Sequence, residues 1–166
     1  MLPPAITEPA AAAVARLRER GETVAVAESA AGGLIAAALV AVPGVSRAFR
    51  GGVVVYQLDA ARIQLAGDVT WPEGERSATE PFTAWLAAAV AARLGADWGV
   101  GETGASGPAG NPYGDPAGHA WTAVHGPAGA GRTQHVLTGD DDRQANMVAF
   151  AAAALHLLRD ALDAPA

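Results

Sequence analysis

Small hydroxyl and glycine residues directly follow the first predicted strand of the chain. Residues 23–27 form an apolar, β-branched run that predicts a buried strand, and Glu28 and Ser29 come next. Two glycines, Gly32 and Gly33, then open an apolar helical run. Backbone N–H groups at such a strand-to-helix turn can bind an anion or a developing oxyanion. The alternative interpretation is an ordinary turn, in which glycine only lets the helix pack closely on the strand.

Further hydroxyl groups lie near the next two predicted strands. Ser46 follows a Pro-Gly pair, Tyr56 ends the second strand, and the third strand leads into a glycine- and proline-rich loop at 103–116. The candidates for ligand contact in that loop are Thr103, Gly104, Ser106, Gly107 and Gly110. A serine becomes a nucleophile beside an activating base, but the four histidines lack the spacing of a recognisable triad. Taken singly, Ser46 is interpreted as a helix cap and Tyr56 as an aromatic residue at the core edge.

The composition excludes several kinds of chemistry. All eleven basic residues are arginine, so no mechanism can use a lysine of this chain, and the absence of cysteine excludes disulfides and thiolate nucleophiles. The net charge is −6 and the arginines are scattered, so we expect no nucleic-acid partner. The acidic run 140–142 suits the start of a helix better than a calcium loop, and we expect neither a metal nor a cofactor. Charged residues, proline or glycine interrupt the apolar runs, so we expect no membrane partner.

Helices and strands alternate along most of the chain. The patterns predict helices at 9–20, 34–42, 58–66, 79–94 and 140–162, and strands at 23–27, 51–56, 96–102, 117–125 and 132–138. This order predicts one α/β domain over residues 1–166, a three-layer α/β/α sandwich with a mixed, mostly parallel sheet of about five strands. Ligands of such sheets bind beyond the carboxyl ends of the parallel strands, which would gather the candidate loops at one edge.

Several blocks of sequence together carry a family resemblance. They are TVAVAESAAGGLIAAAL, VPGVSRAF followed by RGGVVVY, LGADWGV with TGASGPAG, DPAGHAW, and GDDDR before the last helix. In order and spacing these blocks resemble the CinA C-terminal domain family over about residues 10–162. The resemblance implies a cytoplasmic homodimer with a three-layer fold. It also implies an amidase that hydrolyses nicotinamide mononucleotide to nicotinate mononucleotide and ammonia.

The same resemblance suggests roles for individual residues. Ser46 matches the serine that would act as nucleophile, and Tyr56 matches a tyrosine that would assist it. Ser29 matches the serine of the family's AESCTGG turn, where it would bind or orient the ligand. Arg143 matches the arginine of the family's GDR pair. With these residues, the glycines Gly32 and Gly33 and the loop candidates named above would line a pocket for a nucleotide-like small molecule.

This chain departs from the family pattern at charged positions. The family's lysine falls on Ala61, or on Arg62 after a one-residue slip, and neither side chain can accept a proton at neutral pH. The lysine of its KPVG segment becomes Asp115, and a later arginine becomes Met147. All these changes lower the positive charge where the family binds an anionic nucleotide.

Three interpretations follow from these losses. We favour a relative that keeps the ligand pocket but has impaired or lost deamidation, because general-base help is worth roughly 10²–10⁴ in rate. The alternative is an active amidohydrolase with Ser46 as nucleophile and a rebuilt base, and a third option is a rebuilt site for another substrate. We expect Ala61 and Met147 to point into the pocket that holds Ser29 and Ser46.

Overall fold

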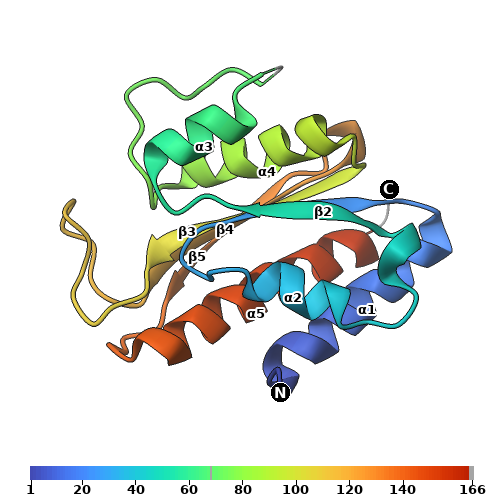
Figure 1. The fold of residues 1–166 in the computed structure, drawn as a ribbon, viewed down its shortest axis with the longest axis horizontal. Coiled ribbons are helices and arrows are strands. Elements are labelled where there is room, and N and C mark those ends of the chain that lie inside the picture. The colour runs from blue at the N-terminus through green and yellow to red at the C-terminus, as the bar shows by residue number, and fades with distance from the viewer. Residues whose placement is uncertain (68, 165–166) are drawn as a thin grey trace.

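A five-stranded mixed sheet forms the centre of the protein in the computed structural model, which describes residues 1–67 and 69–164 (Figure 1). The strands are β1 (Val24–Glu28), β2 (Phe49–Val54), β3 (Trp98–Ala105), β4 (His119–His125) and β5 (Arg132–Leu137). Their order across the sheet is β2-β1-β3-β4-β5. β1 pairs in parallel with β2 and β3, whereas β4 is antiparallel to both of its neighbours. The predicted mixed, mostly parallel sheet of about five strands is therefore confirmed.

Helices cover both faces of this sheet (Figure 1). One layer contains α1 (Pro4–Arg20), α2 (Leu34–Val40) and α5 (Arg143–Asp163), and the other contains α3 (Leu58–Leu65) and α4 (Glu80–Leu94). Two short 3-10 turns, η1 (Val45–Arg47) and η2 (Pro127–Gly129), complete the chain. The predicted three-layer α/β/α sandwich is confirmed.

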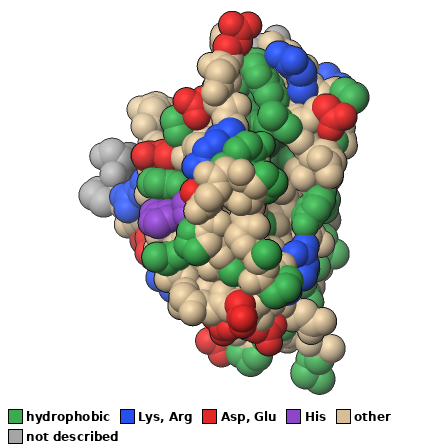
Figure 2. Space-filling model, turned by 90° about the vertical axis from the view of Figure 1, so that its left-hand side faces the viewer, with side chains coloured by type: hydrophobic (Ala, Val, Ile, Leu, Met, Phe, Trp, Pro, Cys, Tyr) green, Lys and Arg blue, Asp and Glu red, His purple; other side chains and the backbone are tan. Residues whose placement is uncertain are grey.

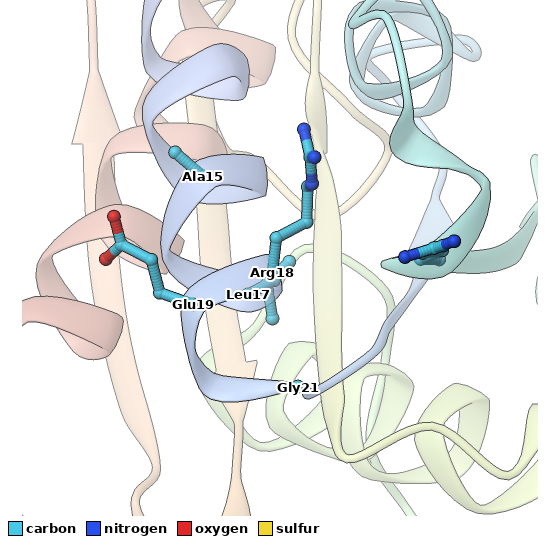
Figure 3. A pocket seen from close by; sticks show the side chains of 6 residues that line it. Ala15, Leu17, Arg18, Glu19 and Gly21 are labelled. Atoms are coloured by element: carbon cyan, nitrogen blue, oxygen red, sulfur yellow. The ribbon is translucent and has the colours of Figure 1, made fainter.

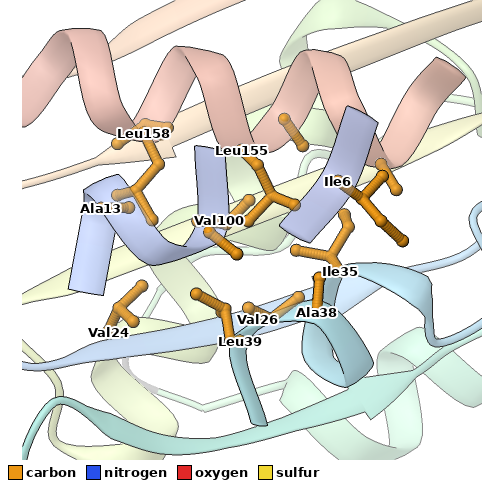
Figure 4. Close-up of a cluster of buried hydrophobic side chains, with 14 of the residues drawn as sticks. Ile6, Ala13, Val24, Val26, Ile35, Ala38, Leu39, Val100, Leu155 and Leu158 are labelled. Carbon is orange, nitrogen blue, oxygen red and sulfur yellow. The ribbon is translucent and has the colours of Figure 1, made fainter. Parts of the chain in front are cut away.

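Alternate side chains of the central strands point into two separate cores. Val24 and Val26 of β1, together with Val100 of β3, pack under α1, α2 and α5 (Figure 4). Ala25 and Ala27 point to the other side, into the core formed with α3 and α4. A strand buried on both faces needs apolar residues at every position, which explains its nearly continuous hydrophobic sequence.

Two glycines of β3 let α4 approach the sheet more closely than side chains would allow. A Cβ atom at Gly101 would lie 2.4 Å from the carbonyl oxygen of Thr83, and one at Gly99 would lie 1.9 Å from that of Ala87. Both obstacles are backbone atoms of α4, which cannot move aside cheaply. This close packing fixes α4 against the strand that leads into the candidate loop.

Two element boundaries differ from the sequence prediction. α1 begins at Pro4 rather than Pro9, and the Thr7 hydroxyl within it donates to the Pro3 carbonyl. Ile6 is fully buried in the core, and this contact stabilises the additional first turn. β3 continues through Ala105, because 103–105 pair with β4, so the glycine-rich loop starts three residues later than expected.

The long C-terminal helix α5 is apolar enough, by length and composition alone, to span a membrane. Half of its most apolar stretch is buried in this structure, against α1 and the sheet. That burial is typical of a core helix. Asp68, Pro165 and Ala166, which belong to the predicted domain, lie outside the described residues.

Candidate functional site

A cavity lies at the carboxyl ends of β1, β2 and β3, on the face covered by α3 and α4. Its volume is about 170 Å³, and it is called the site cavity below. The residues that line it are Ser29, Val55, Tyr56, Gln57, Leu58, Ser77, Phe82, Thr103 and Gly104. Four of these, Ser29, Tyr56, Thr103 and Gly104, are residues that the sequence predicted for a ligand site. The structure therefore brings the first turn, the end of β2 and the end of β3 together at one edge.

The lining of the site cavity combines neutral polar groups with an apolar wall. Hydroxyl groups come from Ser29, Ser77 and Thr103, and Gln57 contributes a side-chain amide. Phe82 adds an aromatic face. Among the described residues, no histidine, carboxylate or arginine side chain lines this cavity. It can therefore donate and accept hydrogen bonds, but it holds no group that accepts a proton readily at neutral pH.

Arg143 connects the rim of the site cavity to the glycine-rich loop. Its Nη2 donates to the Tyr56 hydroxyl at 2.6 Å, and its Nη1 donates to the Gly107 carbonyl at 2.6 Å. Asp142 fixes the start of α5 by accepting from the N–H groups of Gln144 and Ala145. A guanidinium group is thus held beside Tyr56 at the mouth of the cavity, where it can bind an anionic group of a ligand. The view toward this edge shows basic side chains scattered among acidic ones (Figure 2).

Two buried glutamates bind the N–H groups of the first turn. Glu28 accepts from Gly33, Ile35 and Ala36 at 2.9, 3.0 and 2.9 Å. Glu102 Oε2 accepts from Ser29 and Ala31 at 3.1 and 2.8 Å. The expectation that these N–H groups point outward to an anion is therefore wrong. The acceptors for these N–H groups are two of the protein's own carboxyl groups.

Burial changes the acidity of both glutamates. Glu28 and Glu102 occupy registered positions on β1 and β3, and both are almost completely buried. Loss of solvation, together with the neighbouring Glu28 charge, raises the pKa of Glu102 to about 8 against the opposing effect of the N–H donors. Burial also raises the pKa of Glu28, which receives three backbone hydrogen bonds. Glu102 is thus the carboxyl of the pair that keeps its proton near pH 7.

Several predicted site residues lie outside the cavity lining. Ser106 is buried and donates to the Ala30 carbonyl at 3.1 Å, so it supports the turn from below. Gly33 gives its N–H to Glu28, and Gly32 lies against Met147 of α5. Gly107 contributes only its carbonyl to Arg143, and Gly110 packs against the backbone of Asp115.

Ser46 lies at the opposite edge of the sheet. It belongs to η1, which precedes β2, whereas Ser29 follows β1, and the two strands are parallel. A hollow of about 680 Å³ lies at that edge between the end of α1 and η1, and Arg18 and Arg47 line it (Figure 3). The expectation of one pocket holding Ser29 and Ser46 is therefore wrong for the single chain.

Ala61 and Met147 do not share a pocket either. Ala61 is 1% exposed and packs in the core between α3 and α4. Met147 lies on the other side of the sheet, where its terminal methyl group contacts Gly32. Val55 and Phe82 of the same core line the site cavity, whereas Ala61 itself does not.

The glycine-rich loop is held by an ion pair and a histidine pair. Asp115 accepts from both Nη atoms of Arg76, at 2.5 and 3.1 Å, and this contact lowers the pKa of Asp115 to about 2. His119 Nε2 lies 2.9 Å from the Ala78 carbonyl, and its Nδ1 lies 2.9 Å from Nε2 of His135. Asp115 is therefore neutralised by Arg76 within the chain, and its contacts hold the loop in shape.

Sequence reasoning missed the two buried glutamates and five residues that line the site cavity, which are Val55, Gln57, Leu58, Ser77 and Phe82. Ser77 and Phe82 come from the segment before and within α4, and nothing in their spacing connects them to Ser29. Glu28 and Glu102 did carry a signal, because each is a charged residue at the end of an apolar strand. Charged residues are almost never fully buried unless their polar atoms are bound, so such positions mark hydrogen-bonded carboxyl groups.

Comparison with known proteins matches this chain to CinA proteins, both by a family model and by individual relatives. The model of the CinA C-terminal domain family matches residues 6–162. A CinA-like protein of Anaeromyxobacter sp. (strain K) is 40% identical over 149 residues, which cover 90% of this chain and 36% of that protein. A CinA-like protein of Synechocystis is 40% identical over 131 residues, covering 78% of this chain and 31% of the relative. The chain thus spans about a third of the length of these relatives.

Solved structures match the fold over nearly the whole chain. The competence/damage inducible protein CihA from Agrobacterium tumefaciens has a TM-score of 0.88 and 30% identity, covering 99% of both chains. A CinA superfamily protein from Klebsiella pneumoniae has a TM-score of 0.86 and 27% identity, covering 95% of this chain and 97% of its own.

Proposed function

The chain belongs to the CinA C-terminal domain family, and from this premise we propose that it binds a small nicotinamide-nucleotide-like amide in the site cavity without hydrolysing it at an enzymatic rate. The family resemblance supplies the ligand class. The site cavity supports binding without hydrolysis, because the described residues of its lining can form hydrogen bonds with a ligand but include no general base.

The lining has the groups that an aromatic amide requires. Ser29, Thr103 and Gln57 can donate to the amide oxygen or accept from its NH₂ group. Phe82 offers an aromatic face to a pyridine ring. Outside the cavity, Arg143 can pair with a phosphate while remaining bound to the Gly107 carbonyl.

One observation carries the proposal of weak or absent catalysis. Serine attacks an amide when a neighbouring base takes its proton, and no described residue lining the cavity has a side chain that does so at neutral pH. The Ser29 hydroxyl has no hydrogen-bonding partner among the described residues. Positioning alone does not replace a missing base worth roughly 10²–10⁴ in rate.

The competing proposal is an active amidohydrolase that uses Ser46. In a single chain Ser46 is a full strand length away from Ser29, on the opposite edge of the sheet. The competing mechanism therefore needs Ser46 from a second copy of the chain. The homodimer and the cytoplasmic location stay predictions.

The test combines binding and turnover on the same protein. Purified protein is titrated with nicotinamide mononucleotide and with nicotinamide by calorimetry, and ammonia is measured after long incubation. We expect binding that Ser29→Ala and Thr103→Val weaken, with ammonia at the level of the protein-free control. Ser46→Ala is the matched control, since it removes a hydroxyl at the other edge and should leave binding unchanged. Ammonia release that Ser46→Ala or Ser29→Ala abolishes would overturn the proposal.

A further inference from the structure

Glu102 contacts the backbone of the turn that contains Ser29, one of the residues that line the site cavity. Its Oε2 accepts the N–H of Ser29, whose residue lines the cavity, and the N–H of Ala31. The same Ser29 N–H also lies 3.1 Å from the Glu102 carbonyl oxygen. The side chain of Glu102 itself points to the opposite face of the sheet, toward α5. It can therefore act on a ligand only through the position of the turn.

The surroundings of this carboxyl group favour its neutral form. Glu102 is fully buried, and its Oε1 has no hydrogen-bonding partner among the described residues. An ionised carboxylate carries charge on both oxygens, so a buried Oε1 without a donor is costly. Thr122, the registered neighbour on β4, faces the same side of the sheet, and its buried hydroxyl has no partner within the described part of the chain.

Glu28 is the titratable group that faces Glu102. It sits in register on the neighbouring strand, and its charge opposes the ionisation of Glu102. The buried residues of the helices packed on this face, α1, α2 and α5, are apolar apart from Asn146. No described cation therefore balances a second negative charge beneath the turn.

We propose that Glu102 is a positioning residue: its neutral carboxyl group, bound to the N–H groups of Ser29 and Ala31, holds the Ser29 turn in the shape that completes the site cavity, and its ionisation loosens that turn. Two adjacent buried carboxylates then repel each other. The turn would then be held by the Glu28 bonds, the Ser106 bond, and the backbone bonds within the turn and to the Glu102 carbonyl. Ligand affinity follows the fraction of protein whose turn is in the competent shape.

The first experiment needs no ligand. The ¹³C resonance of the Glu102 side-chain carboxyl and the amide resonances of Ser29 and Ala31 are followed by NMR from acidic to alkaline pH. We expect all three to change with one midpoint near pH 8. In Glu102→Gln, which keeps a neutral acceptor, the amide transition should disappear, whereas in Glu28→Gln it should persist at lower pH. Amides that titrate in the ordinary glutamate range, or an alkaline transition that survives in Glu102→Gln, would overturn the proposal.

The second experiment rests on the proposed function and uses nicotinamide mononucleotide as the probe. About one pH unit above the midpoint, a tenth of the protein remains neutral at Glu102, so affinity should fall about tenfold in the native protein and stay constant in Glu102→Gln. Equal alkaline losses in both proteins would contradict the positioning role. If the probe binds at no pH, the proposed function fails, and the amide titration still decides the role of Glu102.

Discussion

Replacing Glu102 by glutamine should remove the contribution of one buried carboxyl group to the pH dependence of stability between mildly acidic and neutral solution. In the unfolded chain this carboxyl has an ordinary pKa of 4.5, and in the folded protein burial raises the pKa to about 8. Between these two values the folded state holds a proton that the unfolded state has released. The free energy of unfolding therefore falls as pH rises through this window, and it is constant with respect to this group below and above it.

The size of this change in the free energy of unfolding follows from the one proton that Glu102 holds in the folded state and releases in the unfolded state. The free energy of unfolding should fall by about 1.4 kcal/mol for each pH unit inside the window, so by roughly 3 kcal/mol over two units. The raised pKa of Glu28 adds a slope of the same sign. Glutamine has the same shape and stays neutral, and its Oε1 can still accept from Ser29 and Ala31. The variant should lose the Glu102 share of this slope and be more stable than the native protein near pH 7.

Urea denaturation measured from about pH 5 to pH 9, followed by circular dichroism, tests this reasoning. Glu28→Gln is the matched control, because it changes the other buried carboxyl and should keep the Glu102 slope. Equal slopes in the native protein and in Glu102→Gln would show that Glu102 is ionised in the folded state. That result would remove the physical basis for the positioning role as well.

Three further predictions test the structure around the cavity. Gly101→Ala should destabilise the protein by about 3 kcal/mol, because the new methyl group meets the Thr83 carbonyl; a normal thermal midpoint would contradict the close packing of α4. Asp142→Ala should cost about 1 kcal/mol by uncapping α5, and Asp142→Asn should recover most of it in urea denaturation. Asp115→Asn should cost about 1 kcal/mol above pH 4, a difference that disappears as the native carboxyl is protonated toward pH 2; an unchanged difference in acid would refute the Arg76 ion pair.

The fold could be predicted from the sequence because each element carries its own periodicity and end signals. The strand at β1 is apolar at consecutive positions, and α4 begins at a Thr79 cap followed by Glu80 and Pro81. The end of β3 could not be predicted in the same way. Its last three residues, 103–105, look like loop sequence, and they form a strand because β4 supplies their hydrogen bonds.

The site was predictable in part. Ser29 and Tyr56 follow β1 and β2, and Thr103 lies in the last part of the neighbouring parallel strand β3, so chain direction alone brings them to one edge. The depth of the cavity and its contributions from Ser77 and Phe82 depend on how the segment before α4 folds over the sheet, and no local pattern records that contact.

The position of Ser46 shows that the direction of a strand determines at which end of the sheet its flanking residues lie. Ser29 comes after β1 and Ser46 comes before β2, and two parallel neighbours place these residues at opposite ends of the sheet. The resemblance linked both serines to one reaction, but a linear match carries no information about which end of a strand a residue occupies. Any action of Ser46 on a ligand in the site cavity must therefore come from a second chain. A serine that acts within one chain and a serine that acts between chains differ in their dependence on protein concentration. Dilution consequently separates a role of Ser29 from a role of Ser46, even where both substitutions lower the same activity.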